Sequence, residues 1–165
     1  MNFQKGIRGE ERAKGVLELL DIKCEINEDY DKRYDYDLSC KMGRKKFTVE
    51  VKFDDKSSTT GNIYIEYHNS KADKPSGVAV TKANLWIHVL PEDDGSKAVW
   101  ISSVSSLREF MEEVEPHKKV AFGGDNNSAG YVYTKESILN KLFKRIDSLE
   151  KAEAVKLIKE MLNDT

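Results

Sequence analysis

The sequence has little cysteine, no long hydrophobic run and no excess of basic residues. Its two cysteines, Cys24 and Cys40, are not spaced as a C-x-x-C pair. This excludes a disulfide scaffold, and we expect two reduced, buried thiols. No apolar run approaches the roughly 20 residues that a bilayer-spanning helix needs. Residues 1–12 are polar and charged, unlike a secretory signal. We therefore expect a cytoplasmic protein.

Acidic and basic residues nearly balance, because 29 Asp and Glu stand against 27 Lys and Arg, for a formal net charge of −2. This excludes the broad positive field of a protein that coats nucleic acid. It does not exclude an enzyme that gathers Lys and Arg on one face and keeps carboxylates elsewhere for metal ions. The length of 165 residues and a hydrophobic content of 39% predict one globular domain with its own core.

Periodic apolar residues predict the secondary structure. A period of 3.6 predicts helices at 5–20, 104–114, 138–146 and 149–162, and alternation predicts strands at 24–26, 34–42, 45–53, 63–68, 85–90 and 98–102. Polar stretches predict loops at 27–33, 56–62, 69–77, 91–96 and 121–130, while 78–83 fits a helix or a loop. This order predicts a single α/β or α+β domain over 1–165, with a central mixed sheet flanked by helices and C-terminal helices from about 136 to 163.

The segment from Asp35 to Lys52 carries the most information about function. Gly43 and Arg44 form a two-residue loop of the Gly-X kind, which a type II′ turn requires. Met42 would then pair with Lys45. Counting back along both strands, Asp37 would lie directly opposite Glu50, and Asp35 opposite Lys52.

Two opposed carboxylates in a sheet require an explanation. Side chains directly opposite each other have Cβ atoms about 4.5–5.5 Å apart, and like charges there destabilise the sheet. A divalent cation between Asp37 and Glu50 would remove the conflict, and Mg²⁺ characteristically binds one or two carboxylates together with water and phosphate oxygens. Lys52 points to the same side as Glu50, so its ammonium could orient water and stabilise charge that develops on a phosphate.

Glu10 is a further candidate. It lies on the apolar side of the first helix, between Ile7 and the group from Ala13 to Leu17. Ionised carboxylates are rarely buried without a partner. We therefore expect Glu10 to face a cation or a lysine where this helix meets the sheet.

Together these residues resemble the PD-(D/E)XK nuclease superfamily over roughly the first half of the chain. The shared features are Glu10 in an N-terminal helix, Asp37 before a hairpin, and Glu50-Val51-Lys52. The compact size and the Gly-x-x-Gly-Glu-x-x-Ala helix are most similar to the Holliday-junction-resolvase-like members. Tyr36 departs from the pattern, since the superfamily often has proline before the aspartate.

This resemblance implies a restriction-endonuclease-like fold and hydrolysis of phosphodiester bonds in DNA, branched or duplex, with Mg²⁺ or Mn²⁺. Asp37, Glu50 and the Val51 carbonyl would hold the metal, Lys52 would act on the attacking water, and Glu10 would complete the site through a metal-bound water. A resolvase needs two active sites, which implies a homodimer. A site-specific restriction or nicking-type endonuclease, and a non-catalytic module that binds nucleic acid or protein, stay open as alternatives.

An acidic residue followed at the second position by lysine is a weak signal alone, because it also occurs at Asp21-Ile-Lys23 and Asp54-Asp-Lys56. On an exposed sheet it is usually a solvated ion pair worth little. Glu66 is a candidate to support the site, or else an exposed strand residue. The connection after it offers candidate nucleic-acid contacts, or simply a surface loop. These contacts are Lys71, Lys74, Ser76 and Lys82. The three histidines, His68, His88 and His117, show no zinc-ligand spacing.

Overall fold

The hydrophobic residues of the chain form two clusters on opposite faces of a six-stranded sheet. The computed structural model describes residues 2–120 and 127–164, without the side chains of 2–7. The strands of this central sheet, in chain order, are β1 (Lys23–Ile26), β2 (Leu38–Met42), β3 (Lys45–Phe53), β6 (Leu85–Pro91), β7 (Lys97–Ser103) and β10 (Lys144–Arg145). They lie side by side in the order β1-β2-β3-β6-β7-β10. The sheet is mixed, because β3 and β6 run parallel and the other neighbours run antiparallel.

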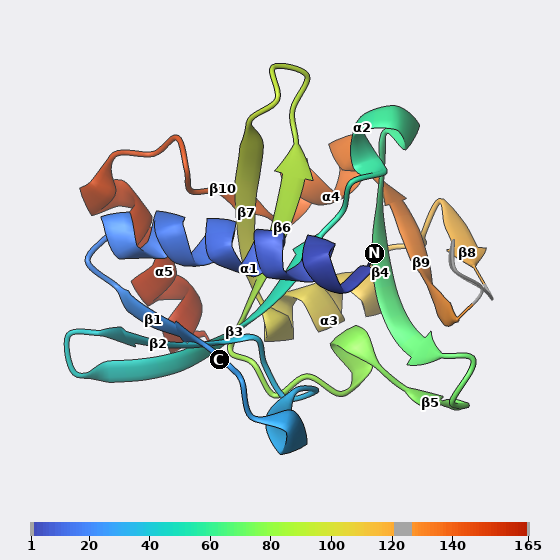
Figure 1. Cartoon of the computed structure of the whole chain (residues 1–165). Helices are drawn as coiled ribbons and strands as arrows, with labels where there is room; N and C mark the ends of the chain where they lie inside the picture. The colour runs from blue at the N-terminus through green and yellow to red at the C-terminus, as the bar shows by residue number, and fades with distance from the viewer. Residues whose placement is uncertain (1, 121–126, 165) are drawn as a thin grey trace.

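One face of the central sheet is covered by α1 (Asn2–Leu19) and α5 (Lys151–Asn163). Both are amphipathic, and their buried faces, represented by Leu17 and Ile158, pack on the inward residues of the strands, such as Val49 and Ile87. Figure 1 shows α1 crossing in front of β6 and β7. This packing fixes the position of the first helix over the strands that carry the predicted site.

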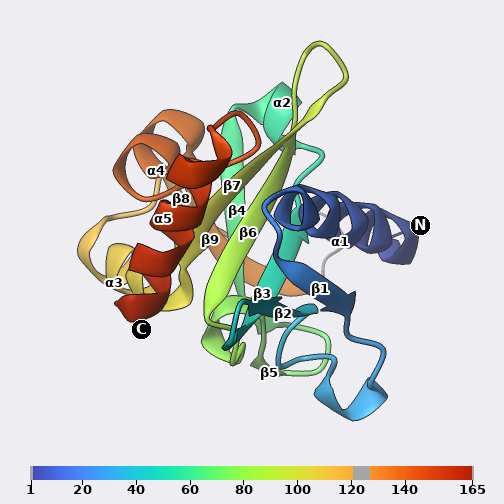
Figure 2. The same ribbon diagram turned by 90° about the vertical axis from the view of Figure 1, so that its left-hand side faces the viewer.

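The other face is covered by a second sheet and by two helices. The four antiparallel strands of this sheet are β4 (Asn62–Asn69), β5 (Lys74–Pro75), β8 (Lys118–Val120) and β9 (Ser128–Thr134), in the order β5-β4-β9-β8. The helices are α3 (Val104–Glu113) and α4 (Lys135–Lys141). Trp86 and Leu90 of β6 pack here with Ile65 of β4 and Leu107 of α3. Figure 2 shows β4 and β9 behind the central strands. The chain is therefore a single α/β domain with a mixed central sheet and flanking helices.

The β2–β3 hairpin confirms the predicted turn. Met42 pairs with Lys45, and the pairing continues in register to Leu38 and Val49. Gly43 has a positive φ of 61°, whereas Arg44 does not have a positive φ. Positive φ at the first loop residue alone is what a type II′ turn requires and excludes type I′.

Several predicted boundaries are wrong. The strand predicted at 34–42 begins only at Leu38, because the preceding residues form a turn after the short 3₁₀ helix η1 (Tyr30–Lys32). The loop predicted at 56–62 contains the one-turn helix α2 (Ser57–Thr60), and the connection at 69–77 contains β5. The segment 78–83, for which the sequence fits a helix or a loop, begins inside a second 3₁₀ turn, η2 (Gly77–Ala79).

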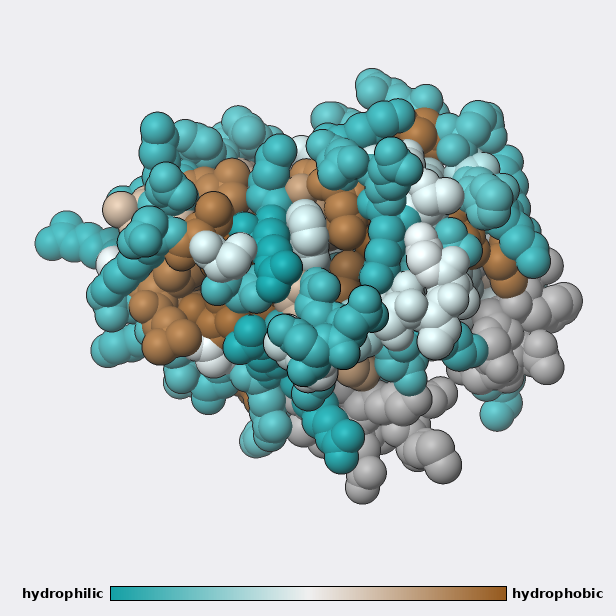
Figure 3. All heavy atoms as spheres, turned by 90° about the horizontal axis from the view of Figure 1, so that it is seen from above, coloured by the Kyte–Doolittle hydropathy of each residue, from teal (hydrophilic) through white to brown (hydrophobic). Residues whose placement is uncertain are grey.

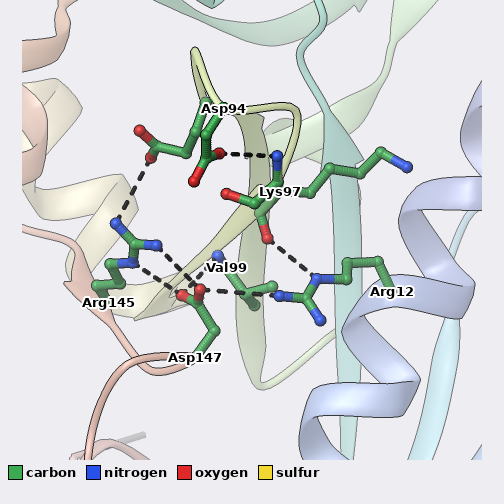
Figure 4. Close-up of polar contacts among 8 residues, drawn as sticks. Arg12, Asp94, Lys97, Val99, Arg145 and Asp147 are labelled. Carbon is green, nitrogen blue, oxygen red and sulfur yellow. Dashed lines mark hydrogen bonds and ion pairs between the residues drawn. The ribbon is translucent and has the colours of Figure 1, made fainter.

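The C-terminal third differs more. The loop predicted at 121–130 is a strand from Ser128 onward, and residues 121–126 lie outside the described residues. The helix predicted at 138–146 ends at Lys141, and Lys144–Arg145 joins the edge of the central sheet. The reason is a polar cluster around Asp147 (Figure 4). The Asp147 carboxylate accepts hydrogen bonds from Val99 N at 2.9 Å and Arg145 Nε at 3.0 Å. These bonds hold the segment in extended form beside β7.

The same cluster holds α1. Arg12 donates from Nε to the Lys97 carbonyl at 3.0 Å, and its Nη2 lies 3.8 Å from Asp147 Oδ2. The first helix is therefore tied to the edge of the sheet through a charged group as well as through the hydrophobic core. Among the helices in the described part of the chain, none has the length and apolar character needed to cross a membrane.

Candidate active site

The predicted site lies where β2 separates from β3. Asp37 is the residue immediately before β2, and its backbone N–H bonds to the Val49 carbonyl at 2.9 Å. Its carboxylate Oδ2 accepts a hydrogen bond from Val51 N at 2.7 Å. Beyond the last backbone pair, Leu38 with Val49, the carboxylate of Asp37 thus takes the place of a backbone acceptor and binds the N–H of Val51.

Two details of the predicted register are consequently wrong. Asp37 does not form a backbone pair directly opposite Glu50, since the ladder ends at Leu38 and Val49. Asp35 does not lie opposite Lys52, because its carboxylate forms an ion pair with Lys82 at 3.1 Å. The chain turns away from β3 before residue 37, so the alternation of 34–37 does not reflect a strand.

Glu50 and Lys52 form an ion pair within β3. Lys52 Nζ lies 2.6 Å from Glu50 Oε1. Glu50 is only 6% exposed, and its other carboxylate oxygen lies 3.3 Å from the hydroxyl of the buried Thr81. The side chain of Lys52 is 39% exposed, and its ammonium, held by Glu50, lies 5.7 Å from the ring centroid of the buried Trp86. Both side chains lie on the face of β3 opposite Val49 and Val51, as predicted.

Glu10 reaches the same place from α1. The helix approaches β3 at Gly9, where an added Cβ would lie 2.9 Å from Phe53 Cβ. Glu10 is half-buried. Burial raises its pKa, the positive charge of Lys52 lowers it, and the negative charge of Glu50 raises it further. The expectation that Glu10 faces a lysine at the helix–sheet junction agrees with this arrangement.

The negative charges of the site exceed its positive charge, and the pKa values of Asp37 and Lys52 are both raised. Burial, and then the charge of Glu50, raise the pKa of Asp37 to about 7, although Lys52 and the hydrogen bond from Val51 act in the other direction. Burial alone would lower the pKa of Lys52, but Glu50 and Asp37 outweigh it and raise that pKa. Lys52 thus interacts with several carboxylates, of which Glu50 is in direct contact. Such a set favours an added cation.

The donors fit a hard divalent cation, which prefers oxygen ligands. In a strand, the N–H and C=O of one residue point to the same side, so the Val51 carbonyl faces the edge at which Asp37 lies. However, within the described part of the chain no three His, Cys, Asp or Glu side chains gather closely enough to hold a metal ion among them. Lys52 is the partner of Glu50 Oε1. A bound cation would therefore have to share Glu50 with Lys52.

Glu66 of β4 lies on the other side of Lys52. Its negative charge contributes to the raised pKa of Lys52, and its Oε1 accepts a hydrogen bond from Ser76 Oγ at 2.6 Å. Lys52 and Glu66 both line a cavity of about 400 Å³, together with Tyr64 and His88. The site thus opens onto a space that a substrate group can enter.

Of the four residues predicted to contact nucleic acid, three are exposed and one is turned inward. Ser76 is turned inward to Glu66, so its hydroxyl is not directed outward to a phosphate. Lys71, Lys74 and Lys82 are exposed. Lys74 lies over the ring of Tyr34, and Lys82 pairs with Asp35.

Two buried polar residues near the site were not predicted as part of it. Thr81 contacts Glu50, and also lies 3.0 Å from the Asp35 carbonyl. His88 is fully buried and neighbours Lys52 across the parallel β3–β6 pair. Its Nδ1 accepts a hydrogen bond from Trp86 Nε1–H at 2.9 Å, so the neutral ring carries its proton on Nε2.

Burial, and then the charge of Lys52, lower the pKa of His88 to about 3. The Nε2 proton has no acceptor among the described residues. The alternation of Trp86 and His88 in one strand is visible in the sequence. The parallel pairing that brings His88 beside Lys52 is not, because it joins strands separated by more than 30 residues of chain.

Comparison of the chain with known protein families, with curated proteins and with solved structures finds no match. The interpretation of the site therefore depends on its own residues and their geometry.

Proposed function

We propose that this chain is a metal-dependent nuclease that hydrolyses phosphodiester bonds in DNA. One observation carries the proposal. The buried Glu50 forms an ion pair with Lys52 at 2.6 Å, the charges of both residues act on Glu10 and Asp37, and burial together with Glu50 raises the pKa of Asp37 to about 7. A merely solvated ion pair on a sheet surface does not need buried carboxylates around it. A mixed sheet flanked by helices, with Glu10 on the first helix and the other groups on a hairpin, also agrees with a restriction-endonuclease-like fold.

The residues have distinct roles in this proposal. Asp37, Glu50 and the Val51 carbonyl would hold Mg²⁺ or Mn²⁺, which supplies an activated water and neutralises charge on the scissile phosphate. Lys52, held by Glu50 at the wall of the cavity, would orient the attacking water and stabilise negative charge on the phosphate. Glu10 would complete the site through a metal-bound water. The hydroxyl of Thr81, 3.3 Å from Glu50 Oε2, fixes the rotamer of Glu50.

Within this class, the compact domain and the Gly-x-x-Gly-Glu-x-x-Ala helix favour a Holliday-junction-resolvase-like enzyme acting as a homodimer on branched DNA. A restriction or nicking-type endonuclease has the same chemistry and differs in substrate. A non-catalytic module that binds nucleic acid or protein is the second candidate. The close Glu50–Lys52 pair, at 2.6 Å, is the observation that favours it, since that pair occupies one of the carboxylate oxygens that a metal would use.

The test is cleavage of supercoiled plasmid and of labelled DNA and RNA substrates, including a four-way junction, a flap and single strands. We expect cutting with Mg²⁺ or Mn²⁺ and none with EDTA. Glu50→Gln and Lys52→Met should each reduce the rate by about 100-fold or more, with unchanged far-UV circular dichroism. Lys46→Met is the matched control, because Lys46 is an exposed lysine of the same strand, and it should keep the wild-type rate. Cutting that persists in EDTA, or in both site variants, would rule out the proposal.

A further inference from the structure

Exposed aromatic rings gather beside the candidate site. Four large hydrophobic side chains of the described residues are exposed, and two of these, Tyr30 at 73% and Tyr34 at 52%, lie on the turn between β1 and β2. The guanidinium carbon of Arg33 lies 3.4 Å from the ring centroid of Tyr30 and 4.4 Å from that of Tyr34. Lys74 Nζ, from β5, lies 4.8 Å from the centroid of Tyr34. We call Tyr30, Arg33, Tyr34 and Lys74 the aromatic platform.

The turn that carries the platform is ordered by its own hydrogen bonds. The Asn27 side-chain amide donates to the carbonyls of Lys32, at 3.0 Å, and Tyr36, at 2.9 Å. The Asp29 carboxylate accepts from Asp31 N at 3.0 Å and so caps η1. Two exposed tyrosines on a braced turn differ from scattered surface residues, which need no explanation. The backbone that carries both rings is therefore ordered by hydrogen bonds within the turn itself.

The platform is connected to the candidate site at two points. Tyr34 lies three residues before Asp37 on the same turn. Lys74 lies two residues before Ser76, which donates to Glu66. In Figures 1 and 2, the turn between β1 and β2 and the strand β5 both lie at the lower end of the molecule, below β3. Short stretches of chain therefore connect the platform to Asp37 and to the residue that holds Glu66.

The chemistry of the platform suits one kind of partner. Arg33 and Lys74 bring positive charge to the rings, which complements a phosphate backbone. Aromatic rings bind nucleic acid by stacking on bases, and only unpaired bases offer their faces. In a duplex those faces are covered by neighbouring base pairs.

We propose that the aromatic platform binds an unpaired stretch of nucleic-acid strand and leads it to the site, with bases stacked on Tyr30 and Tyr34 and phosphates near Arg33 and Lys74. The inference rests on the proposed nuclease function and narrows its substrate class to DNA with a single-stranded segment, such as a branch, a flap or a gap. Neither tyrosine takes part in the chemistry at Asp37 and Glu50.

The test measures binding by fluorescence anisotropy in EDTA, where no cutting occurs, with a labelled single strand and with the corresponding duplex. The double variant Tyr30→Ala, Tyr34→Ala should weaken single-strand binding by about 10-fold or more and leave duplex binding within about twofold. The double variant Tyr30→Phe, Tyr34→Phe keeps both rings and should bind as the wild type does. Leu19→Ala, Leu149→Ala removes the other two exposed hydrophobic side chains and should also bind normally.

Two results would overturn this inference alone while plasmid cutting by the wild type continues. One is single-strand binding by the double alanine variant at the wild-type level. The other is an equal loss of duplex binding, since the rings would then not select unpaired bases. A wild type that neither cuts nor binds any nucleic acid would instead refute the proposed function, and this inference with it.

Discussion

At the scale of single residues, Asp37 experiences two opposed influences. Its carboxylate is fixed by a hydrogen bond from Val51 N, which favours the charged form, yet burial and the neighbouring Glu50 raise its pKa to about 7. In the absence of a cation, Asp37 of the folded protein is therefore mostly protonated below a pH of about 7. A divalent ion would reverse this preference, because it stabilises the carboxylate directly.

This gives a pH dependence with a defined sign. Because the pKa of Asp37 is raised from 3.8 to about 7 on folding, the stability that it contributes declines as the pH rises between those values. His88 acts in the opposite sense, since its pKa is lowered from 6.5 to about 3, and its contribution is lost as the pH falls through that range. The difference between the wild type and Asp37→Asn isolates the first effect.

We expect Asp37→Asn, in EDTA, to exceed the wild type in free energy of unfolding by roughly 1–3 kcal/mol at pH 8, and to lose this advantage near pH 4. Urea denaturation across that pH range measures both. A wild type that is as stable as the variant at pH 8 would show that the charged form of Asp37 does not destabilise the fold, which contradicts the raised pKa.

Alternation within β3 places Glu50 and Lys52 on one face of the strand, as the sequence predicts. For Asp37 the counting fails, because β2 begins only at Leu38 and the carboxylate reaches the backbone of Val51 from outside the ladder. Thr81 could not be found in this way. Its contact with Glu50 depends on the path of a loop 31 residues further along the chain, for which local sequence provides no periodic signal.

At the scale of elements, the contact between α1 and β3 positions Glu10. The helix lies so close to the strand that the hydrogen of Gly9 faces the Cβ of Phe53. The sequence predicted an amphipathic helix here, and α1 confirms it. The sequence could not predict which strand the helix would touch, because periodicity defines a buried face but not its partner.

Substitution of two glycines in α1 tests this contact. Gly9→Ala places a Cβ within 2.9 Å of Phe53 Cβ, which must displace the helix, and we expect a loss of about 1–2 kcal/mol in stability and about 10-fold or more in cutting rate as Glu10 moves. Gly15→Ala is the matched control, because an added Cβ there meets nothing within 4 Å.

Alanine favours a helix over glycine, so Gly15→Ala should gain up to about 1 kcal/mol and keep its activity. Thermal unfolding and a plasmid assay measure both variants. A Gly9→Ala protein with wild-type stability and rate would mean that the close approach of α1 has no part in positioning Glu10.

At the scale of the whole molecule, the central sheet was partly predictable, whereas of the second sheet the sequence predicted only β4. The hairpin β2–β3 and the strands β6 and β7 show clear alternation. Strands β8 and β9 flank a segment with glycines and asparagines that resembles a loop in sequence, although Ser128 to Thr134 pairs with β4 over its length. Long-range pairing of this kind depends on burial against other elements, which local propensity does not record.

The candidate site lies where the β2–β3 ladder ends, on the face of the central sheet that the second sheet covers. Glu50 and Lys52 face the side of the central sheet that the second sheet covers, while Asp37 lies beside Val51 where β2 ends, and Glu10 comes from α1 on the other face. A hydrophobic area visible in Figure 3, on the side where Figure 1 places the C-terminal end of α1 and the start of α5, lies elsewhere on the domain. Leu19 and Leu149 line a groove of about 210 Å³ there.

The central claim is that Asp37 and Glu50 hold a divalent cation, and Mn²⁺ binding measured by electron paramagnetic resonance at pH 8 tests it most directly. The account predicts that the wild type binds Mn²⁺ and that Asp37→Asn weakens this binding by about 10-fold or more. Asp35→Asn, which changes a neighbouring carboxylate paired with Lys82, should bind Mn²⁺ as the wild type does. Equal binding by Asp37→Asn, or no binding by the wild type at millimolar Mn²⁺, would contradict the account.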